Sequence, residues 1–276
     1  MFRKPYYLIP VALAACLVQN ASAVDYNWSG LGDGTSWSDP LNWVQGVVPP
    51  NTANGIFVDP VVSTLPVTIG ASDVVQLTGT LYPEWGQTLD IYGTVNAGYS
   101  IAPVGAIAGP RTFVNLYGNA SLTTGDSIFV GDMWWWSAPP GVDVNLYGNS
   151  QMTTKYLAVG GHLNIYGGTV TALNGLLTGT PTAGVWGSTL STDATRLIDI
   201  AGGKLVVVGD ATAQVNDLIA RGILEGNGVV GNVNIDLLSD PGFTVITVPE
   251  PASVALLGLG GFAMMLVFRR RSSAIS

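Results

Sequence analysis

A short sequence unit recurs along the middle of the chain, and this repetition constrains the fold more than any other feature. Each unit opens with an apolar–polar–apolar pattern, which Tyr-Gly follows in all but the last copy. The units begin, in chain order, at Leu89, Val114, Val144, Leu163 and Ile198. An alternation of period two is typical of a β-strand with one buried face. Each opening therefore predicts a strand with apolar side chains on one face and polar or aromatic side chains on the other.

A unit this short cannot bury a core alone, but stacked units can. Parallel stacking at about 4.8 Å per coil predicts three columns of side chains. They are an inward apolar column (Val114, Val144, Leu163), an asparagine column (Asn115, Asn145, Asn164) and a tyrosine column (Tyr92, Tyr117, Tyr147, Tyr166). The sequence therefore predicts an all-β fold, a right-handed parallel β-helix of about five or six coils over residues 86–240. An antiparallel β-sandwich is the alternative, because short strands between glycines also suit that fold.

Extra segments interrupt the repeat at one point, between the last glycine of a unit and the next opening strand. They cover Asp132–Asp143 and Thr180–Arg196, and Ser100–Arg111 is a third candidate. This shared position predicts that all of them leave the coil at the same edge.

The first insertion carries three adjacent tryptophans, Trp134, Trp135 and Trp136, before Pro139 and Pro140. Three neighbouring tryptophans cannot all face one core. Exposed aromatic rings stack on sugars and anchor protein interfaces. The triplet is therefore a candidate contact to a glycan or a partner, and clamping of the loop onto the body is the alternative.

The N-terminus predicts a secretory signal peptide over residues 1–23. Arg3 and Lys4 form a short basic region, an apolar run follows, and Ala21 and Ala23 flank a small-residue cleavage site. Cleavage after Ala23 would start the mature chain at Val24.

Cys16 is the only cysteine of the chain. The stretch LAAC that ends at Cys16 also fits the pattern before a lipidated cysteine in bacterial lipoproteins, which is the alternative at this terminus. If cleavage follows Ala23, the mature chain has no disulfide, no thiol nucleophile and no cysteine metal ligand.

The C-terminal segment, residues 241–276, combines three elements in order. They are Pro249-Glu250-Pro251, an uncharged apolar stretch over 252–268, and Arg269, Arg270 and Arg271. The apolar stretch predicts a transmembrane helix, and the arginines favour a cytoplasmic C-terminus.

This order resembles the PEP-CTERM sorting signal of Gram-negative bacteria. The resemblance implies recognition by exosortase, a membrane cysteine protease, and removal of the tail. It therefore implies an exported protein that is anchored transiently in the inner membrane and then passed to the outer cell envelope, the cell surface or the extracellular matrix. Members of this group share the tail while their bodies differ, so the resemblance assigns no activity to the body.

The front of the mature chain, residues 24–85, is rich in tryptophan. Trp28, Trp37 and Trp43 with Gly46 resemble the segment that opens many secreted β-helical proteins of autotransporter and PEP-CTERM type. A solenoid needs a covered end, because an open coil exposes its core and strand edges. We expect these tryptophans to form a cap, and ligand binding is the alternative.

The charge of the chain excludes nucleic acid as a partner. Between Val24 and Pro249 there are five basic and seventeen acidic residues, so the formal charge is 5 − 17 = −12. Nucleic-acid affinity rests on Lys and Arg that neutralise phosphates, so such a body would be repelled by DNA or RNA.

The residues give little sign of catalysis, a cofactor or a metal site. His162 is the only histidine, so no second histidine can join it at a metal. The acids beside turns are expected to be solvated turn residues, and those that could pair as acid and base are Asp126, Asp132, Asp143 and Asp210. The sequence thus predicts a structural or adhesive surface protein of the matrix or polysaccharide layer. The alternative is a polysaccharide-acting β-helix enzyme, a lyase or a hydrolase.

Overall fold

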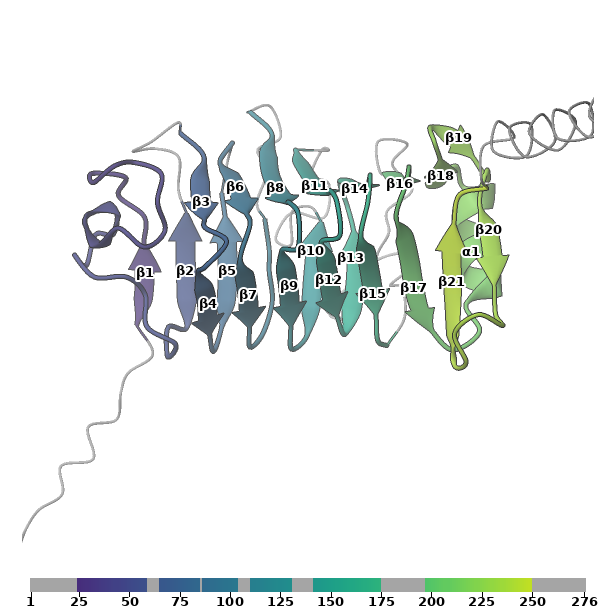
Figure 1. Ribbon diagram of the computed structural model, residues 1–276, viewed down its shortest axis with the longest axis horizontal. Coiled ribbons are helices and arrows are strands. Elements are labelled where there is room, and N and C mark those ends of the chain that lie inside the picture. Colours follow the sequence, from purple (N-terminus) through teal and green to yellow (C-terminus); the bar gives the residue numbers. More distant parts are fainter. Residues whose placement is uncertain are drawn as a thin grey trace, which may run out of the picture.

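The computed structural model describes residues 24–58, 65–84, 86–103, 110–130, 141–174 and 197–249. These residues form an elongated stack of β-strands (Figure 1). Most neighbouring strands run parallel, as a β-solenoid requires and unlike the strands of an antiparallel sandwich. The predicted stacked parallel architecture is confirmed, and the right-handed sense of the coil stays a prediction.

Two eight-stranded sheets form two long sides of the stack. The first, the asparagine sheet, contains in spatial order β19 (Val229–Val230), β18 (Leu224–Gly226), β16 (Leu197–Ile200), β14 (His162–Ile165), β11 (Val142–Leu146), β8 (Thr112–Leu116), β6 (Thr88–Ile91) and β3 (Val67–Ile69). The second, the threonine sheet, contains β20 (Asn234–Asp236), β21 (Phe243–Thr247), β17 (Lys204–Val208), β15 (Thr169–Ala172), β12 (Gln151–Thr154), β9 (Ser121–Thr124), β7 (Thr94–Ala97) and β4 (Val74–Leu77).

Two smaller sheets form a third side that the opening pattern of the repeat did not identify. Its strands are β1 (Asp25–Asn27), β2 (Gly55–Val58), β5 (Thr80–Pro83), β10 (Ser127–Val130) and β13 (Tyr156–Val159). Ile101 bridges Leu81 and Ile128 in parallel, so it links β5 to β10. A complete coil therefore has three sides.

The predicted register of the repeats is confirmed. Val144 lies between Val114 and Leu163 in the asparagine sheet, and the weaker units join the same column through Leu89 and Ile198. All five side chains are at most 1 % exposed. In the described residues, six successive strand pairs build the stack: β3–β4, β6–β7, β8–β9, β11–β12, β14–β15 and β16–β17.

Glycine makes the corner between the two long sheets. Gly118 and Gly148 follow tyrosines and have φ values of +62° and +66°. Glycine populates this left-handed region without a Cβ penalty, so the chain can turn from one sheet into the other within a few residues.

Three buried tryptophans close the N-terminal end. Trp28, Trp37 and Trp43 are 2–3 % exposed, and Trp43 makes edge-on contacts to the other two at centroid distances of 5.0 and 4.7 Å. Asn42, at the end of the short 3-10 helix η1 (Pro40–Asn42), accepts hydrogen bonds from the backbone of Gly32 and Gly34 at 2.9 and 3.0 Å. The tryptophan rings are part of the core and offer no surface to a ligand.

The C-terminal end is covered differently. Helix α1 (Thr212–Ala220) buries Val215 and Leu218. Strand β21 pairs antiparallel with β17, and β20 pairs antiparallel with β21. Since β21 falls within the segment 241–276, the folded body reaches at least residue 247.

The predicted insertions Ser100–Arg111 and Asp132–Asp143 are shorter than predicted, because Ile101 belongs to the third side and β11 already begins at Val142. Their central residues lie outside the described residues. The described ends before Ser100–Arg111 and Asp132–Asp143, at Ile101 and Val130, lead from the third side toward the next strand of the asparagine sheet. These two insertions therefore leave the stack at the same corner.

Within the residues that the structure describes, no helix is long and apolar enough to span a membrane. The predicted signal peptide, 1–23, and the predicted transmembrane helix, 252–268, lie outside them.

Candidate functional site

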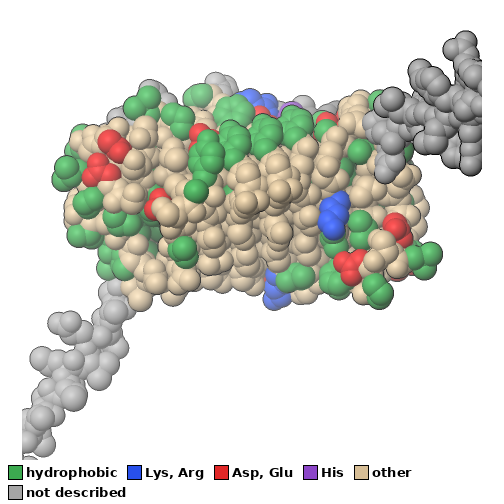
Figure 2. Space-filling view, in the orientation of Figure 1, with side chains coloured by type: hydrophobic (Ala, Val, Ile, Leu, Met, Phe, Trp, Pro, Cys, Tyr) green, Lys and Arg blue, Asp and Glu red, His purple; other side chains and the backbone are tan. Residues whose placement is uncertain are grey.

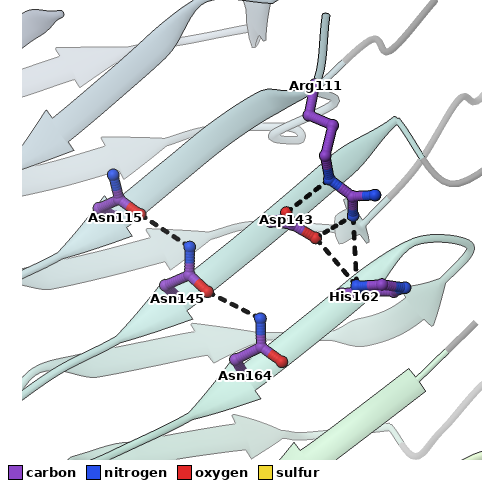
Figure 3. A network of polar contacts seen from close by, with 6 residues as sticks. All are labelled: Arg111, Asn115, Asp143, Asn145, His162 and Asn164. Carbon is purple, nitrogen blue, oxygen red and sulfur yellow. Dashed lines mark hydrogen bonds and ion pairs between the residues drawn. The ribbon is translucent and has the colours of Figure 1, made fainter. Parts of the chain in front are cut away.

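A ladder of hydrogen-bonded amides runs along the outer face of the asparagine sheet (Figure 3). The Nδ2 atom of Asn164 donates to Oδ1 of Asn145, and Nδ2 of Asn145 donates to Oδ1 of Asn115, both at 2.8 Å. Asn115 in turn donates to the carboxylate of Asp90 at 2.8 Å. The predicted asparagine column is confirmed, and its amides satisfy one another from coil to coil.

The predicted tyrosine column is also confirmed. Neighbouring rings of Tyr92, Tyr117, Tyr147 and Tyr166 stack at centroid distances of 4.9, 5.1 and 5.1 Å, with interplanar angles of 18°, 7° and 14°. Burial raises the pKa of Tyr117 and Tyr147 above the usual tyrosine value. The inner rings are covered by their neighbours, while Tyr92 and Tyr166 at the ends are 44 % and 47 % exposed.

Beside the ladder, three charged or titratable side chains meet, although they are far apart in the sequence (Figure 3). The guanidinium of Arg111 binds both carboxylate oxygens of Asp143, with Nε 2.7 Å from Oδ2 and Nη2 close to Oδ1. The Nδ1 atom of His162 lies 3.2 Å from Asp143 Oδ1 and 3.2 Å from Arg111 Nη2. Strand pairing produces this cluster, because Asp143 and His162 are register neighbours in β11 and β14.

The environment keeps Asp143 ionised. Burial alone would raise its pKa, but hydrogen bonds from His162 and Arg111 and the charge of Arg111 outweigh it and lower the pKa below the usual value. The expectation that Asp143 is a solvated turn residue was wrong. Its side chain lies within a strand, is 12 % exposed and is held by a bidentate charge-assisted contact.

The structure does not bring the other candidate acids to this cluster. Asp126 lies at the start of β10, where it accepts a hydrogen bond from Ser127 at 2.9 Å and faces Lys155 at 4.0 Å. Asp210 accepts from the backbone of Thr212 just before α1, and Asp132 lies outside the described residues. Among the described side chains, no group of three or more His, Cys, Asp and Glu could hold a metal ion.

The remaining predicted sites lie outside the described residues, apart from Pro249. This concerns the signal cleavage site, Cys16, the tryptophan triplet and the tail: Ala21, Ala23, Cys16, Trp134, Trp135, Trp136, Glu250, Pro251, Arg269, Arg270 and Arg271. Pro249 is half-buried and follows β21 by two residues. The folded body therefore leads directly into the C-terminal segment.

The C-terminal segment carries the evidence for where the protein is sorted. Residues 247–271 match the PEP-CTERM protein-sorting motif. The sorting motif implies an exported protein that an exosortase processes and that is sorted to the cell envelope. No curated protein and no solved structure matches the chain. The sorting motif covers a small part of the sequence, so the role of the body rests on its own geometry.

Proposed function

We propose that the protein is a structural or adhesive component of the extracellular matrix or polysaccharide layer. A signal peptide over residues 1–23 directs its export, and a helix over 252–268 anchors it transiently in the inner membrane. Exosortase then removes the tail, and the body passes to the outer envelope or the cell surface.

The observation that carries this proposal is the outer face of the asparagine sheet. Amides and rings that could contact a substrate are instead joined to one another across successive coils. Such contacts stiffen a stack along its axis, because each coil is held to the next by side chains as well as by backbone pairing. Both ends are covered, at Trp43 and at α1, which protects the stack from edge-to-edge aggregation.

Export and sorting are tested by mass spectrometry of surface material from producing cells. Peptides from the body should be abundant, and none should come from residue 252 onward. As a matched control, replacement of Arg269, Arg270 and Arg271 with serine should leave the tail on the protein. An intact tail on most wild-type surface molecules contradicts processing.

Adhesion is assigned to Trp134, Trp135 and Trp136, next to Pro139 and Pro140. Prolines restrict a loop, so less conformational entropy is lost when it meets a ligand. A neutral glycan is the ligand of choice, because the formal charge of −12 between Val24 and Pro249 repels acidic polymers unless a cation bridges them.

The test is a glycan array with the purified protein. Replacement of all three tryptophans with alanine should abolish binding of the short glycans of the array and leave the circular dichroism spectrum and melting temperature unchanged. The control replaces three exposed apolar side chains of the N-terminal end, Leu31, Leu41 and Val44, with alanine and should keep binding. Loss of stability in the tryptophan variant, with no glycan binding by the wild type, assigns the triplet to loop clamping.

The second candidate is a polysaccharide lyase or hydrolase. The observation that favours it is the meeting of a carboxylate, an imidazole and a guanidinium at Asp143, His162 and Arg111, since acid–base pairs at hydrogen-bond distance are the apparatus of proton transfer. Release of reducing ends or unsaturated products from polysaccharides, lost in Asp143→Asn, would establish it. No release from a broad panel of polymers would remove it.

A further inference from the structure

The outer face of the threonine sheet carries two columns of uncharged polar side chains between β7 and β15. Strand pairing aligns the first column, Asn96, Thr123, Thr153 and Thr171. It aligns the second column, two residues earlier on each strand, Thr94, Ser121, Gln151 and Thr169. We call these two columns the hydroxyl face. The side chains between them point inward and are buried: Val95, Leu122, Met152 and Val170.

The hydroxyl face differs from the asparagine ladder in what its polar groups do. In the part of the chain that the structure describes, none of its side chains hydrogen-bonds to another residue. All of them are at least partly exposed. Their donors and acceptors are therefore open to solvent or to a ligand. The β-branched threonines are restricted at χ1, so little side-chain entropy is lost when a ligand binds.

The hydroxyl face is also uncharged. Figure 2 shows a broad band of side chains that are neither hydrophobic nor charged over the lower strands of the stack, with a basic side chain toward the C-terminal end. Toward the C-terminal end, the first charged side chain in register with the second column is Lys204, the parallel neighbour of Thr169.

Aromatic rings border the hydroxyl face. The tyrosine column lies at the corner where the asparagine sheet turns into the threonine sheet, since Tyr117 follows β8 and β9 begins at Ser121. Figure 2 shows a row of hydrophobic side chains along the upper border of the uncharged band. The terminal rings, Tyr92 and Tyr166, are 44 % and 47 % exposed, and such rings combine an apolar face with a hydroxyl group.

We propose that the hydroxyl face binds a neutral, linear polysaccharide that lies along the axis of the stack. Hydroxyl and amide groups both donate and accept hydrogen bonds, so they can pair with a sugar hydroxyl that acts either as donor or as acceptor. Each column repeats at the strand spacing of about 4.8 Å, so successive sugar rings meet equivalent side chains. The absence of a cation on the face selects against carboxylated or sulfated polymers. This inference rests on the proposed adhesive function and adds a second candidate polysaccharide contact to Trp134–Trp136.

The test is affinity electrophoresis of the full chain in mild detergent. Native gels contain hydroxyethyl cellulose or galactomannan as neutral polymers with a linear backbone, or alginate as an acidic one. The triple variant Thr123→Val/Thr153→Val/Thr171→Val removes three hydroxyls and keeps side-chain shape. We expect at least tenfold weaker retardation by the neutral polymer that retards the wild type. The corresponding triple serine variant, which keeps the hydroxyls, should retain most of it.

The matched control makes the same change on the other long sheet, as Thr68→Val/Thr88→Val, and should bind like the wild type. Circular dichroism and melting temperature check that every variant is folded. If a neutral polymer retards the wild type and the threonine triple variant equally, the hydroxyl face is not the site and the adhesive function stands. If alginate alone retards the wild type, this inference is overturned. If no polymer retards the wild type, the adhesive function falls with it.

Discussion

The two long sheets share one backbone arrangement and use their outer faces in opposite ways. On the asparagine sheet, polar groups pair within the protein, as in the chain from Asn164 through Asn145 to Asn115. On the threonine sheet, the outward side chains of the hydroxyl face, such as Thr123 and Thr153, have no such partner among the described residues. The comparison teaches that register alone does not decide whether a column is structural or available for binding. The asparagine amides of the first sheet reach the next coil, whereas the hydroxyls and amides of the hydroxyl face do not.

The inner faces should behave alike, and here we expect the largest effects. Leu116 and Leu122 are 0–1 % exposed, one on each sheet. A carboxylate buried without a partner is costly, so Leu116→Asp and Leu122→Asp should each lower the free energy of unfolding by about 4 kcal/mol or more. Urea denaturation measures this. Asn115→Asp, on the outer side of the same strand as Leu116, should be milder, and an effect equal to that of Leu116→Asp contradicts the register.

Interrupting the ladder should have the next largest effect. Asn145→Val leaves Oδ1 of Asn115 without its donor and Nδ2 of Asn164 without its acceptor, in a region where Asn145 itself is 7 % exposed. Unpaired buried polar groups cost about 1–3 kcal/mol, so chemical denaturation should show a loss of that size. No loss of stability would mean that the ladder does not hold the coils together.

The Asp143 cluster gives the asparagine sheet a pH dependence. The pKa of Asp143 is lowered in the folded protein, so its contribution to stability is complete above the unfolded-state value of about 3.9. It is lost as the pH falls through the folded-state pKa. Melting temperatures between pH 6 and 2 should therefore decline less steeply in Asp143→Asn than in the wild type. Parallel curves for the two proteins contradict this contribution.

The smallest effect is expected at Thr153, in the same coil as Asn145. Thr153→Val removes a hydroxyl without an intramolecular partner among the described residues and keeps a β-branched side chain, which strands favour. The free energy of unfolding should change by at most about 0.5 kcal/mol. A loss of stability as large as that of Asn145→Val would contradict the difference that we infer between the outer faces of the two sheets.

Much of the stack could be predicted from the sequence because its units repeat in phase. The apolar, asparagine and tyrosine columns follow from the alternation at Val114, Asn115 and Tyr117, and the structure confirms them. The third side has a weaker pattern, since it passes through single bridges at Ile101.

The polar cluster could not be predicted, because its members come from different contexts. The sequence places Arg111 at the end of a predicted insertion, and its side chain binds Asp143, which follows 32 residues later in the chain. The signal that could have revealed it is the register itself, which sets Asp143 beside His162. The antiparallel return of β21 depends on the folded end of the stack, and no local pattern fixes such a pairing.

The asparagine ladder also bears on how this protein can change its length. Both Asn–Asn steps have the same donor, the same acceptor and the same 2.8 Å distance, so a coil could be duplicated or deleted and the ladder would still close. The carboxylate of Asp90 can only accept, and Asp199, the register neighbour of Asn164, is likewise an acid. Carboxylates thus bracket a segment of interchangeable modules, and the length of the body becomes a quantity that evolution can adjust in whole coils.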